Sequence, residues 1–418
     1  MGRHCPARTT LLYGLVVLKF WASSAQPESW TTSTVAGDGS EGYQDGGVQD
    51  GTKFGFIDYR QNPSPWLVGV TVMEDDRTAV LVDNYNQMIR KIDLRTMQTA
   101  TVVSTRAPCE LNKCQCGSDL TAECNDPRRH TKAAQLSGIV GLTSEVYFSN
   151  RWNEAAKDTS APAIWRINLK DTVITPRPIP HKMLTTNITF APFGIAKGSS
   201  AADLIFTNYG ASICKINVFS GEITYIAGPA IRGLPGEIQG YQDGFGASVQ
   251  VASPMGITTD IARRYSYFVD SILCNVRRLE LSTLEVTTLA GPRSKDDGNF
   301  QCGYNDGIGD DIRFTTPTGI AYLAGNRLAI TDTSDHLLRI VSIDDLSSKT
   351  IGGSRGQAGW VDGLQAGLVR FNLPNGVATT SNGGTIVLAD QGSNRVRSIV
   401  KLCAPFYIGE YSGTLLCP

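Results

Sequence analysis

FNLPNGVATTSNGGTIVLADQGSNRVRSIVKL, residues 371–402, contains the parts of a short strand meander. Gly376 opens an apolar run, and Gly383-Gly384 marks a turn before the β-rich run TIVLA at 385–389. The polar stretch 390–394 marks a second turn, and a third β-rich run follows at 396–400. Short β-rich runs separated by Gly- and Asn-rich turns are typical of consecutive antiparallel strands. The stretch therefore predicts three strands joined by tight turns.

The same pattern recurs along the chain. The stretch 314–343 repeats it and adds a fourth strand at 349–351, which ends in Gly352-Gly353. Further copies are recognisable at 251–281 and 69–94. The glycines that head the repeats are Gly69, Gly141, Gly194, Gly256, Gly319 and Gly376. Repeated units of four short strands are the signature of a β-propeller, so we predict an all-β fold with six four-stranded blades.

Three features of the repeat resemble the NHL-repeat family of six-bladed propellers. The first is a Pro-x-Gly opening, at Pro192, Pro254, Pro317 and Pro374. The second is an aspartate at the end of the second strand, at Asp83, Asp270, Asp332 and Asp390. The third is an arginine in the third strand, at Arg90, Arg277, Arg339 and Arg397; Trp165 and Cys214 stand in its place in blades two and three. The resemblance implies a propeller over nearly the whole chain.

The two ends of the repeat array are each incomplete. Residues 31–37 (TTSTVAG) resemble a fourth strand without the three strands that should precede it, and the last repeat ends at Leu402 without a fourth strand. An open ring would leave strand edges and blade faces unpaired. We therefore predict a propeller over 31–402, closed by the N-terminal strand as the last strand of the last blade, and a C-terminal tail over 403–418.

The N-terminus has the composition of a targeting segment. Arg3 and Arg8 precede an apolar run at 11–21, and small residues at 22–25 suit cleavage. This pattern predicts a signal peptide over 1–25, and an uncleaved anchor is the alternative. We expect a secreted or organelle-lumen protein with no transmembrane segment after the signal peptide. The net charge of −1 falls to about −4 after cleavage, and the absence of a basic block argues against nucleic acid as a partner.

Nine of the ten cysteines follow the predicted signal peptide, so at least one lacks an intrachain partner. In an oxidising compartment the clustered cysteines indicate disulfides. The candidates are Cys109, Cys114, Cys116 and Cys124 in a Cys-rich insertion at 105–130, and Cys403 and Cys417 in the tail. Zinc binding is the alternative for the cluster, although the pattern lacks two CxxC halves. Cys214 and Cys274 could also join neighbouring blades, and Asn187 opens an N-glycosylation sequon.

A short loop recurs between consecutive blades, as GYQDG twice, GYNDG and GWVDG. Its aromatic and acidic residues are candidates for binding a ligand or partner, and they are Tyr43, Asp45, Tyr241, Asp243, Tyr304, Asp306, Trp360 and Asp362. All of these loops should lie on one face of the disc. Calcium held by the aspartates is a second interpretation. A third is architectural: Asp-Gly forms tight turns, and the aromatic residue packs between blades.

The recurring third-strand arginine also has two interpretations. Four arginines around a central channel could bind an anion. Alternatively, each arginine pairs with an aspartate of its own or a neighbouring blade, such as Asp332 or Asp390, and fixes a blade turn.

No catalytic motif is apparent, so no catalytic residue, metal ligand or cofactor is assigned, although calcium is possible. A related propeller enzyme, the peptide-amidating lyase, uses a histidine-coordinated metal, whereas His130, His181 and His336 fall in an insertion, a connector and a blade turn. The expected function is a non-catalytic scaffold that binds a protein or glycan partner, with 105–130 as a candidate contact surface. The alternative is a calcium- or zinc-dependent hydrolase or lyase with its site in the central channel.

Overall fold

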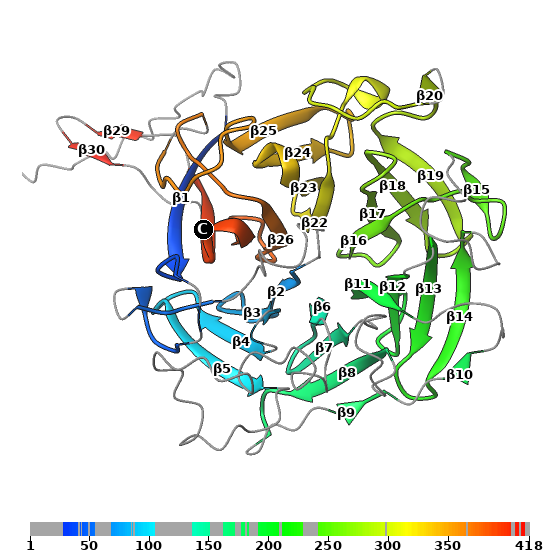
Figure 1. The fold of residues 1–418 in the computed structure, drawn as a ribbon, viewed down its shortest axis with the longest axis horizontal. Helices are drawn as coiled ribbons and strands as arrows, with labels where there is room; N and C mark the ends of the chain where they lie inside the picture. Colours follow the sequence, from blue (N-terminus) through cyan, green and yellow to red (C-terminus); the bar gives the residue numbers. More distant parts are fainter. Residues whose placement is uncertain are drawn as a thin grey trace, which may run out of the picture.

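The computed structural model describes residues 28–40, 42, 44–48, 51–54, 68–84, 86, 88–104, 136–150, 162–171, 177–179, 182–183, 191–208, 211–228, 241–296, 299–364, 367–402, 406–408 and 411–413. Six antiparallel blades surround a central axis, as the repeat predicts (Figure 1). No helix in the described part of the chain is long and apolar enough to cross a membrane. The predicted signal peptide, the Cys-rich insertion, Asn187, Cys403 and Cys417 lie outside the described residues.

Each blade places its first strand nearest the axis (Figure 1). Blade 1 comprises β2 (Val70–Val72), β3 (Thr78–Asp83), β4 (Met88–Asp93) and β5 (Gln98–Ser104). Blade 2 comprises β6 (Leu136–Gly141), β7 (Glu145–Asn150), β8 (Ala163–Asn168) and β9 (Arg177–Pro178). Blade 3 comprises β11 (Pro192–Lys197), β12 (Asp203–Asn208), β13 (Ser212–Asn217) and β14 (Glu222–Ala227).

Blade 4 comprises β16 (Pro254–Thr259), β17 (Tyr265–Asp270), β18 (Asn275–Glu280) and β19 (Glu285–Ala290). Blade 5 comprises β22 (Pro317–Leu323), β23 (Arg327–Asp332), β24 (Leu337–Ser342) and β25 (Ser348–Gly353). Blade 6 comprises β26 (Pro374–Thr379), β27 (Thr385–Asp390), β28 (Arg395–Leu402) and β1 (Ser29–Ala36). Short additional strands are β10 (Lys182–Met183), β15 (Gly244–Phe245), β20 (Lys295–Asp296), β21 (Asn299–Phe300), β29 (Phe406–Ile408) and β30 (Tyr411–Gly413).

The ring is closed by the N-terminal strand, as predicted. β1 pairs antiparallel with β28, from Ser29 opposite Leu402 to Ala36 opposite Val396. The pairing converts a three-stranded blade into a four-stranded sheet in the order β1-β28-β27-β26. Because the two ends of the propeller thereby meet in one sheet, blade 6 can pack against blades 5 and 1 like any other blade.

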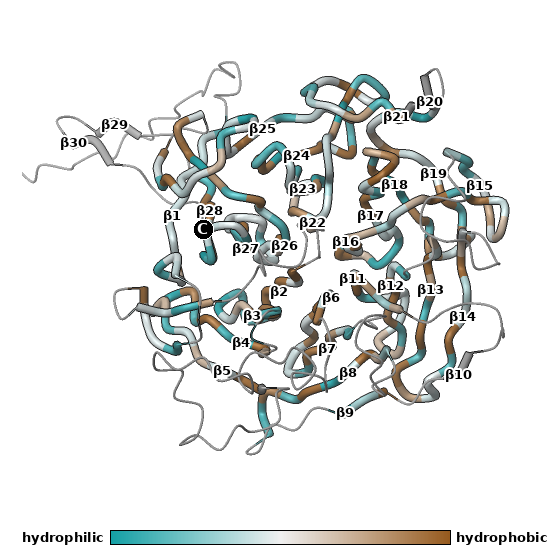
Figure 2. Tube along the Cα trace, in the orientation of Figure 1, coloured by the Kyte–Doolittle hydropathy of each residue, from teal (hydrophilic) through white to brown (hydrophobic). Residues whose placement is uncertain are grey.

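The hydrophobic core is divided into six clusters, one at each junction between neighbouring blades. The junction of blades 5 and 6, for example, contains Leu338, Phe371 and Leu388. Alternating strand residues point to opposite faces of a blade, so each blade contributes to two clusters. Figure 2 shows the resulting change between hydrophobic and hydrophilic residues along β13 and β14.

Six glycines bring the innermost strands of neighbouring blades into close contact. A methyl group on any of them would lie only 1.7–2.6 Å from a backbone carbonyl oxygen of the next blade. The pairs are Gly69 with Ser137, Gly138 with Phe193, Gly194 with Met255, Gly256 with Thr318, Gly319 with Asn375, and Gly376 with Val68. The prediction that Gly141 heads blade 2 was wrong. Gly138 makes the close approach in this blade, and Gly141 lies three residues later, at the end of β6. In all six blades this glycine therefore lets two backbones approach closely, which only glycine allows.

We expect Gly376→Ala to destabilise the propeller, because its methyl group would collide with the Val68 carbonyl oxygen at the junction of blades 6 and 1. Overpacking of this kind costs about 1–3 kcal/mol. Gly367→Ala is the matched control, since open space surrounds the position where its methyl group would lie. Urea unfolding followed by circular dichroism should show a lower midpoint for Gly376→Ala alone. Equal midpoints for the two variants would contradict the close-approach explanation.

Candidate functional site

The aspartates of the repeated inter-blade loops are bound by the third-strand arginines. In blade 5, the Arg339 guanidinium lies 2.7 Å from Asp306 Oδ1, and the backbone N–H of Thr350 donates to Asp306 Oδ2 at 2.8 Å. Each aspartate therefore joins its loop to both the third and the fourth strand of a blade. The equivalent trios are Asp45, Arg90 and Thr101; Asp243, Arg277 and Thr288; and Asp362, Arg397 and Thr34.

A second carboxylate, at the end of the second strand, faces the same arginine from inside the blade. Arg90 lies 3.1 Å from Asp83, Arg339 lies 3.5 Å from Asp332, and Arg397 lies 2.8 Å from Asp390. We call an arginine with its loop aspartate and its strand aspartate an arginine clasp. The arginine side chains are fully buried, whereas the loop aspartates are 30–46% exposed.

The clasp also includes an aromatic ring in three blades. The guanidinium carbons of Arg90, Arg339 and Arg397 lie 4.5–5.2 Å from the ring centroids of Phe54, Phe314 and Phe371 respectively. Burial raises the pKa of Asp332 and that of Asp390 to about 6, against the opposing attraction of the adjacent arginine. Both carboxylates are therefore ionised at neutral pH and neutralise a buried cation. The pairing interpretation of the arginines agrees with this geometry.

Blades 2 and 3 replace the clasp by neutral groups. Asn150 occupies the strand-aspartate position in blade 2, where its Oδ1 accepts hydrogen bonds from the Ala163 N–H at 2.7 Å and Trp165 Nε1 at 3.1 Å. In blade 3, Asn208 Oδ1 accepts from the Ala191 N–H at 2.7 Å, and its Nδ2 donates to Ser212 Oγ. Where the arginine is absent, the carboxylate is absent too, so no buried charge is left uncompensated.

The aromatic residues of the repeated loops are only partly buried. Tyr304 is 37% exposed and Trp360 is 61% exposed. Trp360 stacks on Arg395, whose guanidinium lies 4.1 Å from the ring centroid. The Tyr241 hydroxyl donates to the Leu273 carbonyl oxygen at 3.2 Å. Tyr43 lies outside the described residues.

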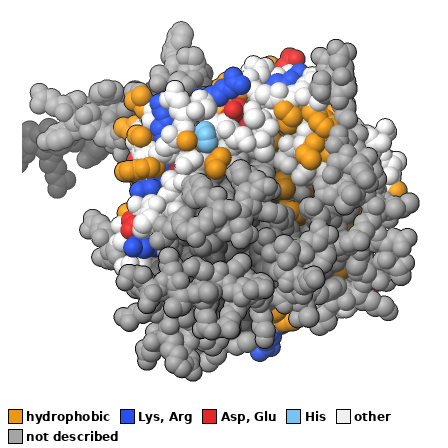
Figure 3. All heavy atoms as spheres, in the orientation of Figure 1, with side chains coloured by type: hydrophobic (Ala, Val, Ile, Leu, Met, Phe, Trp, Pro, Cys, Tyr) orange, Lys and Arg blue, Asp and Glu red, His pale blue; other side chains and the backbone are white. Residues whose placement is uncertain are grey.

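The described candidate residues share one face but not one site. Hydrophobic, basic and acidic side chains are intermingled over the described part of the face seen in Figure 3. The four loop aspartates are held in four different blades, each by its own arginine. Binding of a partner by these loops, or of calcium by their aspartates, stays a prediction.

A central cavity of about 400 Å³ opens at the opposite face. Its lining begins at the residue after each close-approach glycine and continues to the turns between the first and second strands. Six branched aliphatic side chains, one from each blade, form its innermost level: Val70, Ile139, Ile195, Ile257, Ile320 and Val377. Each exposes only 4–7% of its surface and packs into the hydrophobic cluster of one blade junction, so the floor of the cavity is apolar and firmly held.

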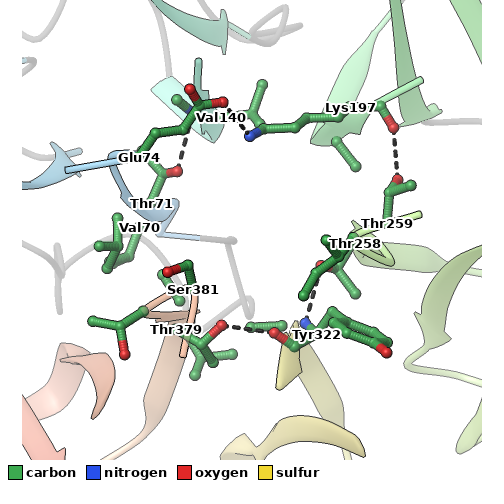
Figure 4. A pocket seen from close by; sticks show the side chains of 18 of the residues that line it. Val70, Thr71, Glu74, Val140, Lys197, Thr258, Thr259, Tyr322, Thr379 and Ser381 are labelled. Atoms are coloured by element: carbon green, nitrogen blue, oxygen red, sulfur yellow. Dashed lines mark hydrogen bonds and ion pairs between the residues drawn. The ribbon is translucent and has the colours of Figure 1, made fainter. Parts of the chain in front are cut away.

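Polar groups from all six blades surround this cavity above the floor (Figure 4). Thr259 Oγ1 donates to the Lys197 carbonyl oxygen at 2.6 Å, and Thr379 Oγ1 donates to the Tyr322 carbonyl oxygen at 2.6 Å. The Tyr322 N–H in turn donates to Thr258 Oγ1 at 3.1 Å. These hydrogen bonds join blade 3 to blade 4, blade 4 to blade 5 and blade 5 to blade 6.

Two of the three remaining junctions are joined at the same level. The Gly141 N–H donates to Thr71 Oγ1 at 3.0 Å, which joins blade 2 to blade 1. The Ser381 N–H donates to Asp76 Oδ1 at 2.7 Å, which joins blade 6 to blade 1. A belt of inter-blade hydrogen bonds thus holds the mouth of the cavity in a fixed shape.

An ion pair crosses the mouth above blade 2. Glu74, after β2, lies 3.1 Å from Lys197, at the end of β11, and accepts a hydrogen bond from Thr143 Oγ1 at 2.8 Å. The Thr143 hydrogen bond and the Lys197 ammonium lower the pKa of Glu74. The side chains of Glu74 and Lys197 are 45% and 31% exposed, so the pair contributes only about 0–1 kcal/mol to stability. Asp76, Asp260 and Arg263 complete the charged rim.

None of the rim residues was among the residues singled out in the sequence. They lie three or more positions after the glycines that head the repeats, where the repeat has no common residue type. Aligning the glycines would have placed Lys197, Thr259, Tyr322 and Thr379 at one level. The sequence therefore contains enough information to place these residues at one level, but it does not reveal the hydrogen bonds between the blades.

One disulfide is present among the described cysteines, and it differs from the bridge expected between blades. Cys274, in the turn between β17 and β18, is bonded to Cys302, with a Cα–Cα distance of 5.3 Å. Cys214 is buried and has no disulfide partner. The Cys214–Cys274 pairing was therefore wrong. The bridge ties blade 4 to the segment that leads into blade 5.

His336 links blades 5 and 6 on the inter-blade-loop face. It has a left-handed backbone conformation, with φ at +61°, and its Nδ1 accepts the Leu373 N–H at 3.0 Å. Leu373 is itself left-handed, with φ at +51°. Burial lowers the pKa of His336, and Asp335 opposes this effect. Protonation of Nδ1 would remove the acceptor at this junction.

No family model matches the chain. A 151-residue stretch is 30% identical to Protein SUPPRESSOR OF QUENCHING 1, chloroplastic, from Arabidopsis thaliana, and covers 35% of this chain and 14% of that protein. The match thus spans about a seventh of that relative's length. A Bacteroides thetaiotaomicron protein of unknown function covers 90% of this chain and 76% of its own, with a TM-score of 0.63 and 17% identity.

An auxiliary nutrient binding protein from the same bacterium covers 90% of this chain and 77% of its own, with a TM-score of 0.59 and 15% identity. A putative phosphatase from that bacterium covers 90% and 79%, with a TM-score of 0.58 and 14% identity. At these identities the likeness concerns the fold, and it supports the six-bladed propeller.

We predict that Arg339→Met destabilises the protein by about 3–5 kcal/mol, because Asp332 would remain buried without its cation. The double variant Arg339→Met with Asp332→Asn should regain much of this loss, since it imitates the neutral arrangement of blades 2 and 3. Chemical denaturation of the wild type and the two variants measures the difference. If the double variant is no more stable than the single one, charge compensation is not the reason for the clasp.

The stability contributed by His336 should depend on pH. Because its pKa is lowered by folding, the unfolded chain binds the proton more readily; the contribution is complete above about pH 6.5 and is lost as the pH falls toward the lower folded-state pKa. Asparagine tolerates a left-handed backbone and has an oxygen acceptor. His336→Asn should therefore flatten the decrease in unfolding free energy below pH 6.5. An unchanged pH profile in this variant would assign the dependence to other groups.

Proposed function

We propose that this chain is a non-catalytic propeller of the NHL-repeat type that binds, in its central cavity, a small ligand or an exposed group of a protein or glycan partner. The observation that carries the proposal is the cavity itself, in which an apolar floor lies beneath a fixed belt of hydroxyl, peptide and charged groups. Ligand sites typically combine apolar walls with a few well-placed polar groups, in volumes of about 300–1,000 Å³. The cavity, at about 400 Å³, lies within this range of volumes, and its lining combines apolar with polar groups.

The side chains at the mouth support binding more than catalysis. Glu74 and Asp76 are engaged by N–H and O–H donors from other blades, so they maintain the shape of the mouth. Within the described residues, no group of three or more His, Cys, Asp or Glu side chains could hold a metal ion. The alternative is a calcium- or zinc-dependent hydrolase or lyase in the channel, which metal analysis of the purified protein addresses directly.

Two further points are compatible with a binding role in an oxidising compartment. The Cys274–Cys302 disulfide favours such a compartment, since cytosolic thiols are kept reduced. We therefore retain the secretory pathway as the proposed location. Two propellers of similar fold are described as auxiliary nutrient binding proteins, which is compatible with a ligand site in this architecture. The ligand itself must be sought from the residues of this cavity.

The proposal is tested by screening sugars, amino acids and organic acids for compounds that raise the melting temperature of the protein. Lys197→Met removes one rim charge but keeps the backbone carbonyl that Thr259 binds. Lys349→Met, on the outer strand β25, is the matched control for loss of a lysine. At least one compound should stabilise the wild type and Lys349→Met and fail to stabilise Lys197→Met.

Two results would count against the proposal. Compounds that stabilise all three proteins equally would place the binding site elsewhere. Stoichiometric calcium or zinc in the purified protein, together with chemical conversion of a stabilising compound, would favour the metal-dependent enzyme.

A further inference from the structure

We propose that the central cavity takes a zwitterionic α-amino acid with an apolar side chain, an inference that rests on the proposed binding function and specifies its ligand. The cavity offers three kinds of complementary surface at once. These are an apolar floor, the cations of Lys197 and Arg263, and the carboxylate of Glu74. A free amino acid has the corresponding three groups: a side chain, a carboxylate and an ammonium.

The floor selects for an apolar group. Its six valine and isoleucine side chains line the cavity and are 4–7% exposed. A branched or aromatic side chain that reaches the floor would release water from apolar surface on both partners. A fully hydroxylated sugar would instead lose hydration there without gaining hydrogen bonds. The floor therefore favours a ligand with an apolar end.

Glu74 and Lys197 supply a pair of opposite charges. They belong to blades 1 and 3 and meet above blade 2 at the rim of the cavity (Figure 4). Because both are partly exposed, their mutual attraction is weak and a ligand can replace it at low cost. An inserted zwitterion would present its ammonium to Glu74 and its carboxylate to Lys197. A ligand with a single charge would leave one partner unmatched.

Arg263, in the turn between β16 and β17, supplies a second cation at the rim. Asp260 Oδ1 holds this turn by accepting the backbone N–H groups of Arg264 and Tyr265, at 2.8 and 3.2 Å. Arg263 lines the cavity, and its charge contributes to the lowered pKa of Glu74, but its guanidinium forms no hydrogen bond or ion pair within the described part of the chain. Its backbone is held in a left-handed conformation, with φ at +53°. A guanidinium without a partner, at the mouth of a cavity, is suited to bind a carboxylate.

Isothermal titration calorimetry with four probes separates the contributions of the ligand's side chain, carboxylate and ammonium to the binding affinity. L-leucine carries all three groups, N-acetyl-L-leucine lacks the ammonium, L-leucinamide lacks the carboxylate, and glycine lacks the side chain. We expect L-leucine to bind the wild-type protein at least about tenfold more tightly than each of the other three. Arg263→Gln and Lys197→Met should each weaken L-leucine binding by about tenfold or more, with Lys349→Met unchanged.

The outcomes distinguish the ligand class from the binding function. If N-acetyl-L-leucine or L-leucinamide binds as tightly as L-leucine, the zwitterion is not recognised and the inference is wrong. If no amino acid binds but another compound loses affinity in Lys197→Met, the inference fails and the binding function of the cavity stands. If no compound depends on Lys197 or Arg263, both fail together.

Discussion

A buried guanidinium that must be neutralised organises most of this propeller. Arg90, Arg277, Arg339 and Arg397 are fully buried in the third strands. Each draws in the aspartate of the preceding inter-blade loop, and the same aspartate accepts the N–H of the fourth strand. One side chain thus holds three separate segments of a blade. In blade 6 the fourth strand is β1, so the clasp of Arg397 and Asp362 also binds the N-terminal strand that closes the ring.

The two blades without a clasp show that the cation and its carboxylates are replaced as a set. Trp165 and Cys214 stand where an arginine would be, and Asn150 and Asn208 stand where a strand aspartate would be. A carboxylate without its cation would cost several kcal/mol in the blade interior, whereas an amide satisfies the same N–H donors without charge. The departures of blades 2 and 3 from the repeat are therefore consistent with each other.

The sequence was sufficient for features that repeat and insufficient for features that do not. The strand meander, the six blades and the closing strand follow from spacing and from the two incomplete ends. The pairing of arginines with aspartates was one of two interpretations, since a sequence does not show whether a side chain points into a channel or into a blade. Gly141 was mistaken for Gly138 because two glycines lie three residues apart in β6, and only the approach to the Phe193 carbonyl oxygen distinguishes them.

The cavity was not predicted because the residues that line it lie at the same height along the propeller axis but differ in chemical type. Lys197, Thr259, Tyr322 and Thr379 differ from one another, and their common position depends on how six strands pack around the axis. The disulfide was missed for a similar reason: Cys274 and Cys302 are separated by β18, β19 and a connecting segment. The recurring loops each supply an aspartate to a third-strand arginine. The irregular positions at the other face form the cavity.

The central claim is that a ligand enters the cavity at the face that carries the turns between the first and second strands, and that it reaches the floor of valine and isoleucine side chains. Methyl NMR of the isoleucine-labelled protein, titrated with L-leucine or with any compound found by the thermal screen, tests this directly. The account predicts chemical-shift changes at Ile195, Ile257 and Ile320 on the floor. Ile308, which is exposed beside the turn between β24 and β25 and does not line the cavity, should not respond. Changes at Ile308 with a silent floor would contradict the account and return the repeated loops to the centre of the search.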